Sequence, residues 1–228
     1  MPKNELCPAD ALRTPASALL PDERTNAFAV IDQGMVRKIT QADHHGAIAR
    51  FELSSAVPIA VRIHFETARN LYLYAWFVYR FYPVAEQHAL TSLEFALRER
   101  LIRGHLSKSK AERMGLSDLL KRARSHGLIS NEALRGRPKW AAEMARQRYS
   151  LEQLNVMIAS GCETISFDDS KVEPAAEDLA YDRIDDFIKY LPDIRNDYSH
   201  GSETLRHTVL RTFEIVADLI SQLFPANT

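Results

Sequence analysis

The chain has 228 residues, of which 46% are hydrophobic and 26% are charged, and its formal net charge at pH 7 is −1. This composition is ordinary for a globular protein with a sizeable core, and it excludes a fibrous protein, a chain disordered over its whole length and a polycation. Cys7 and Cys162 match no zinc-binding or redox spacing, which predicts a reducing compartment.

The N-terminal residues lack the apolar core of a signal peptide. The most apolar run, residues 71–79, has nine residues, whereas a membrane-spanning helix needs about 20. We therefore expect a cytoplasmic protein without a membrane span.

Residues 1–50 are expected to form a partly irregular N-terminal arm, because they hold four prolines and show no sustained helical period. Within this arm, residues 27–31 could form a short strand and residues 43–51 a short helix. The remaining residues, 51–228, are expected to form one helical domain with an insertion at about 104–172.

Apolar side chains at helical spacing predict four main helices, at residues 58–82, 84–103, 175–191 and 203–224. The clearest stripe is Leu90, Leu93, Leu97 and Leu101. Prolines are expected to break the chain at Pro83 and to stop or restart the third helix at Pro192. Weaker helices in the insertion should end at Gly127 and Gly161. The predicted fold class is all-α, a helical bundle.

Charge is unevenly distributed along the chain. Residues 98–148 contain fourteen Lys and Arg but five Asp and Glu, whereas residues 163–190 contain nine acidic residues. Such asymmetry indicates either a nucleic-acid contact or a match between segments or subunits, and two solvated helix faces of opposite sign are an equal alternative.

The most unusual stretch, residues 191–202, lies between the last two predicted helices and contains Arg195, Asn196 and His200. On a helix, Asn196 and His200 would share a face, so the amide oxygen could accept a hydrogen bond from the imidazole and fix its tautomer. Arg195 and His200 diverge on a regular helix and converge only if the backbone bends near the histidine, which Gly201 would permit.

Arg195, four intervening residues and His200 resemble the R-x4–6-H signature of the HEPN superfamily, with Asn196 as its preferred polar residue after the arginine. The resemblance covers about residues 58–103 and 173–224. It implies an all-α HEPN-like bundle that acts as a homodimer, and in many members a metal-independent endoribonuclease of toxin, antiviral-defence or RNA-processing systems. It implies no cofactor, and it allows an antitoxin or another complex partner.

In such a site the 2′-hydroxyl of the RNA attacks the neighbouring phosphate. Two copies of His200, one from each subunit, would serve as base and acid, while Arg195 would stabilise the transition-state charge and Asn196 would orient the imidazole. Two alternatives stay open. Arg195 could pair with a nearby acid while His200 only caps a helix, or the chain could be a HEPN-like interaction or dimerisation module without cleavage.

Other candidates are weaker. His44 and His45 lack a third metal ligand at a helical or hairpin spacing, which favours a surface pair. Glu94 and Arg98 are spaced as an i,i+4 ion pair, with a supporting role beside the motif as the alternative. The aromatic residues of the run 72–79 favour a core or a dimer interface over a platform for stacked bases.

Overall fold

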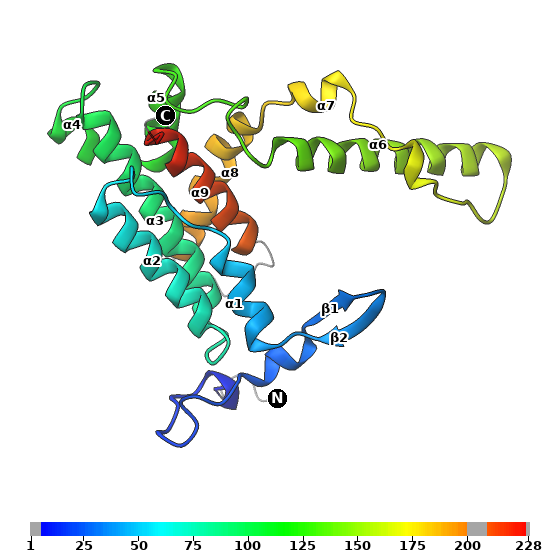
Figure 1. Cartoon of the computed structure of the whole chain (residues 1–228), viewed down its shortest axis with the longest axis horizontal. Helices are drawn as coiled ribbons and strands as arrows, with labels where there is room; N and C mark the ends of the chain where they lie inside the picture. The colour runs from blue at the N-terminus through cyan, green and yellow to red at the C-terminus, as the bar shows by residue number, and fades with distance from the viewer. Residues whose placement is uncertain (1–5, 200–208, 227–228) are drawn as a thin grey trace.

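The computed structural model describes residues 6–199 and 209–226, most of which are helical (Figure 1). The sheet in the described residues is a two-stranded antiparallel hairpin, β1 (Ala29–Asp32) and β2 (Met35–Lys38). The predicted predominantly helical class is confirmed. None of the helices in these two ranges combines the length and the apolar character that crossing a bilayer requires.

Two long helices, α2 (Ile59–Tyr74) and α3 (Phe81–Ile102), form the centre of the bundle. The turn between them lies at residues 75–80, so the expected break at Pro83 is wrong. Pro83 lies in the first turn of α3, where a backbone N–H has no helical partner and a proline is tolerated. The predicted leucine stripe of α3 is confirmed, since all four leucines are fully buried.

Helix α8 (Arg183–Ser199) continues through Pro192, so the expected stop or restart at this proline is also wrong. A proline inside a helix costs about 3 kcal/mol. However, Leu191 and Ile194 on either side of it are buried in the same core as Ile184 and Phe187. Packing of α8 on α3 and α5 therefore keeps this stretch helical.

Helix α9 (Val209–Leu223) packs on α3 and is buried along most of its length, including Phe213, Val216 and Ile220. Its expected start near residue 203 lies outside the described residues. Helix α1 (Gln41–Ala49) begins at a capping box formed by Thr40 and Asp43, and it contacts α2 and α9.

The insertion holds α5 (Leu116–Ser125), which packs on α3 and α8, and α6 (Arg137–Ser160), which projects away from the bundle (Figure 1). Both helices end before a glycine with positive φ, Gly127 and Gly161, as predicted. The smaller elements of this part are α4 (Lys108–Glu112), the 3-10 turn η3 (Asp169–Lys171) and α7 (Ala176–Ala180).

The N-terminal segment contains two 3-10 turns, η1 (Pro8–Asp10) and η2 (Glu23–Ala27), before the hairpin. Asp22 fastens it to the bundle, because this fully buried carboxylate accepts hydrogen bonds from the Arg24 guanidinium at 2.8 Å and from the Tyr79 backbone N–H at 3.2 Å. Burial alone would raise the pKa of Asp22, but these donors lower it to about 2. Asp22 is therefore ionised at neutral pH.

Candidate functional site

The motif residues Arg195 and Asn196 lie near the C-terminal end of α8. Helix α8 is continuous to Ser199, and the bend near the histidine that would bring Arg195 and His200 together lies beyond the described part of this helix. His200 and Gly201 lie outside the described residues, so the predicted contact between Asn196 and His200 is not described by the structure. The Oδ1 atom of Asn196 accepts a hydrogen bond of 3.3 Å from Arg195. An amide oxygen has two lone pairs, so this bond leaves room for a second donor.

Arg195 reaches across to α3, where its Nη2 atom lies 3.5 Å from the carboxylate of Glu94. The Glu94 side chain is 5% exposed, whereas that of Arg195 is 39% exposed. The guanidinium is thus anchored on its inner side by a buried anion while part of it faces solvent. Arg195 therefore contacts an acid of α3 that lies far from it in sequence.

Glu94 also forms the predicted i,i+4 ion pair with Arg98. Arg98 in turn donates to the backbone carbonyl of Ala111 at 3.3 Å and of Met114 at 3.1 Å. The predicted ion pair of Glu94 with Arg98 is therefore confirmed, and the same carboxylate also contacts the motif arginine. The contact with Arg98 holds the Glu94 carboxylate in place. Because this carboxylate is held, it can in turn position the guanidinium of Arg195.

A second buried carboxylate, Glu86 of α3, holds the end of α8 and the start of α9 together. It is fully buried and accepts hydrogen bonds from the Tyr198 hydroxyl at 2.6 Å and from the Thr212 hydroxyl at 2.5 Å. Glu86 was not among the residues predicted from the sequence. It is in helical register with the leucine stripe of α3, and an acid at a core position was the signal that could have identified it.

The basic and acidic segments contact each other in part. Arg124 lies 2.6 Å from Asp182, and Arg148 lies 2.6 Å from Asp178. A backbone hydrogen bond from Ala175 and the bond from Arg148 lower the pKa of Asp178 below its usual value. The match between segments, one of the alternatives drawn from the charge pattern, therefore accounts for some of these charges.

The remaining candidates are placed as follows. His44 is not on the surface but buried, with its Nε2 atom 3.0 Å from the Tyr72 carbonyl, whereas His45 is exposed. Tyr72 and Trp76 are in the core and Tyr74 is 51% exposed. Across residues 6–199 and 209–226, no group of three or more His, Cys, Asp or Glu side chains is arranged to hold a metal ion.

Comparison with known proteins found no matching family model, no matching curated protein and no matching solved structure. The arguments for a function therefore come from the motif and from its surroundings in this fold.

Proposed function

We propose that this chain is a metal-independent endoribonuclease of HEPN type, which cleaves RNA at a composite site in a homodimer, in a toxin or antiviral-defence role. The observation that carries the proposal is the placement of Arg195. Its guanidinium is partly exposed at the end of a core helix and is anchored from behind by the buried Glu94. A positioned planar cation of this kind suits a phosphate whose negative charge increases in the transition state.

The proposed reaction uses the 2′-hydroxyl of the RNA as nucleophile. One copy of His200 removes its proton, and the second copy protonates the leaving 5′ oxygen. The products are a 2′,3′-cyclic phosphate and a 5′-hydroxyl, so atoms and protons balance without a cofactor. Since one chain has one motif histidine, the two roles require two subunits.

A second candidate is a HEPN-like interaction module without cleavage. The ion pair between Arg195 and Glu94 favours it, because the carboxylate already compensates part of the positive charge that a phosphate would meet. In this alternative, Arg195 stabilises the packing of α8 on α3. The RNA-cleavage assay below separates the two candidates.

The test is incubation of the purified protein with a 5′-labelled single-stranded RNA in the presence of EDTA. We expect cleavage, products that end in a 2′,3′-cyclic phosphate, and a mass in light scattering of twice the 25.9 kDa of the chain. Cleavage that requires a divalent metal, or products with a 3′-hydroxyl, would overturn the proposed mechanism. A strictly monomeric protein that cleaves RNA would remove the composite site.

A further inference from the structure

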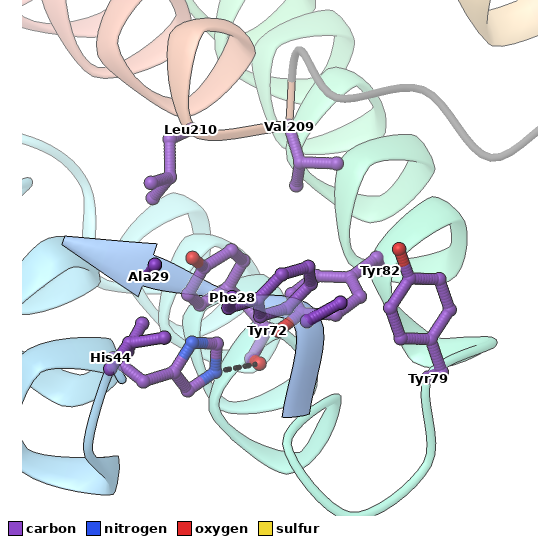
Figure 2. Close-up of a pocket in the computed structure, with 10 residues that line it drawn as sticks. Phe28, Ala29, His44, Tyr72, Tyr79, Tyr82, Val209 and Leu210 are labelled. Atoms are coloured by element: carbon purple, nitrogen blue, oxygen red, sulfur yellow. Dashed lines mark hydrogen bonds between the residues drawn. The ribbon is translucent and has the colours of Figure 1, made fainter. Parts of the chain in front are cut away.

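A cavity of about 400 Å³ lies between the N-terminal segment, the α2–α3 turn and the start of α9. This volume is within the range of small-molecule sites, which is about 300–1,000 Å³. Its walls are aromatic and aliphatic, as Figure 2 shows, and they come from segments far apart in the sequence. Residues that line it include Phe28, Ala29, His44, Tyr72, Tyr79 and Tyr82.

The rings around the cavity are ordered by contacts with one another. Tyr82 makes edge-to-face contacts with Tyr72 and Tyr79, each at 5.2 Å between ring centroids, and His44 stacks on Tyr72 at 4.5 Å. Because these rings are already ordered, little side-chain entropy would be lost when a planar ligand binds against their faces and edges.

The cavity also has polar groups that lack partners. Within the described part of the chain, the hydroxyls of Tyr72 and Tyr82 make no hydrogen bond, although these residues are only 5% and 8% exposed. The two hydroxyl oxygens are themselves accessible to solvent, so a molecule bound in the cavity can reach them. Burial raises the pKa of Tyr72 to about 12 and also raises that of Tyr82, so both hydroxyls stay protonated and can donate.

The charges near the cavity favour a neutral guest. Among the lining residues that the structure describes, none has a carboxylate, and the nearby Asp22 is already bound by Arg24. The Arg24 guanidinium lies 4.8 Å from the centroid of the Tyr79 ring and already occupies a cation position there. Burial lowers the pKa of His44, so its ring is neutral at pH 7. A cationic ligand would therefore lack a counter-ion.

Glu86 connects this cavity to the motif. It lies one turn after the cavity residue Tyr82 on α3. Its carboxylate accepts a hydrogen bond from Tyr198 of the motif. It accepts a second one from Thr212, which lies one turn after the cavity residue Val209 on α9. The aromatic cavity and the end of α8 are thus neighbours across one buried carboxylate.

We propose that this cavity binds one nucleobase of a single-stranded RNA, next to the motif. The aromatic walls would stack on the base, as in other single-strand binding sites, and the two tyrosine hydroxyls would donate to its acceptor atoms. This inference rests on the proposed function, since it assigns the substrate as a single-stranded RNA with one base held in a pocket.

The test measures binding of the four nucleoside 5′-monophosphates to the protein by calorimetry, since a mononucleotide has no internucleotide bond that the proposed reaction could cleave. We expect at least one nucleotide to bind. Tyr82→Phe, which keeps the ring, should weaken binding by roughly 3- to 10-fold, the effect of one lost hydrogen bond. Ala29→Leu, which narrows the cavity with a larger apolar side chain, should weaken binding tenfold or more. Tyr74→Phe, at an exposed tyrosine outside the cavity, is the matched control and should leave binding unchanged.

Absence of binding for all four nucleotides, or equal affinities in Tyr82→Phe, Ala29→Leu and the control, would overturn the inference. Indole, an aromatic ring without the acceptor atoms of a base, should bind more weakly, and indole binding as tight as the best nucleotide would also overturn it. The two proposals fail separately. Nucleotide binding without RNA cleavage removes the ribonuclease and leaves the pocket, whereas RNA cleavage without nucleotide binding removes the pocket and leaves the ribonuclease.

Discussion

The hydroxyl of Tyr198, in the last turn of α8, donates a hydrogen bond of 2.6 Å to the fully buried carboxylate of Glu86 on α3. Because Glu86 also accepts from Thr212 of α9, one carboxylate fixes the relative positions of the two helix ends that border the motif. The position of the candidate site therefore depends on a core residue far from it in sequence.

Tyr198→Phe removes one of these donors and is expected to lower the free energy of unfolding by about 1–3 kcal/mol, since a buried carboxylate loses a hydrogen bond. Urea denaturation measures the loss. The matched control is Tyr181→Phe, which removes a hydroxyl that bonds to Asp186 at 3.3 Å on the surface and should cost less than about 0.5 kcal/mol. Equal losses in the two variants would show that the bond to Glu86 adds no stability.

Glu94→Gln keeps the shape of the side chain but removes the charge that anchors Arg195. We expect RNA cleavage to fall by roughly 10- to 100-fold, because a misplaced guanidinium fits the transition state poorly. RNA affinity should not fall, since no cation is lost. Glu112→Gln is the matched control, as Glu112 is an exposed partner of Lys108 in another i,i+4 pair. Unchanged cleavage in Glu94→Gln would contradict a positioning role for Glu94.

The stability of the protein should decrease as the pH falls below about 6.5, the ordinary pKa of histidine. Burial lowers the pKa of His44, and burial together with the neighbouring His64 lowers that of His88, whose ring stacks on His64 at 4.8 Å. Between the lowered pKa values and 6.5 the unfolded chain binds more protons than the folded one. The stability that comes from keeping these two histidines neutral is therefore complete above pH 6.5. It is lost as the pH falls from 6.5 through their lowered pKa values.

Urea denaturation between pH 5 and pH 7.5 measures this dependence. His88→Gln should flatten it, whereas His45→Gln, at the exposed neighbour of His44, should leave it unchanged. A dependence of the same steepness in His88→Gln would show that protonation of His88 is not responsible.

Neutralising single arginines in the basic segment should separate RNA contacts from internal contacts. Arg122 has no ion pair in the described part of the chain, whereas Arg124 binds Asp182. The salt dependence of RNA binding is the slope of the logarithm of the binding constant against the logarithm of the salt concentration. Arg122→Ala is expected to reduce the magnitude of this slope by about one, and Arg124→Ala by less. Electrophoretic mobility shifts at several salt concentrations measure both slopes. Equal slopes in Arg122→Ala and the unmodified protein would leave this segment without a role in RNA binding.

The sequence predicted the helices well where the apolar period was regular, as in the leucine stripe of α3 and the apolar face of α5. It was wrong at Pro83 and Pro192, because the effect of a proline depends on its position in a helix and on the packing around it. Pro83 lies in the first turn of α3, where a backbone N–H would have no helical acceptor. Burial of Leu191 and Ile194 keeps α8 helical around Pro192.

The candidate site was predicted only in part. Arg195 and Asn196 could be chosen because unusual residues cluster in one short segment. Their partner Glu94 lies about a hundred residues earlier, and local spacing carries no information on such a contact. The cavity was missed for the same reason, since its walls come from the N-terminal segment, α2, α3 and α9 and meet only in the folded chain.

The most direct test of the central claim is the single-turnover cleavage rate of a labelled RNA by the unmodified protein and by the His200→Ala and Arg195→Ala variants. Lys189→Ala serves as control, since it removes an exposed cation from the same helix as Arg195. We predict a loss on the order of 10²- to 10⁴-fold for His200→Ala, with the fold preserved. The loss for Arg195→Ala should be comparable and only partly restored in Arg195→Lys, and Lys189→Ala should show none. An RNA with a 2′-O-methyl group at the cut site should resist cleavage. Cleavage of that RNA, or full activity of the His200→Ala protein, would contradict the account.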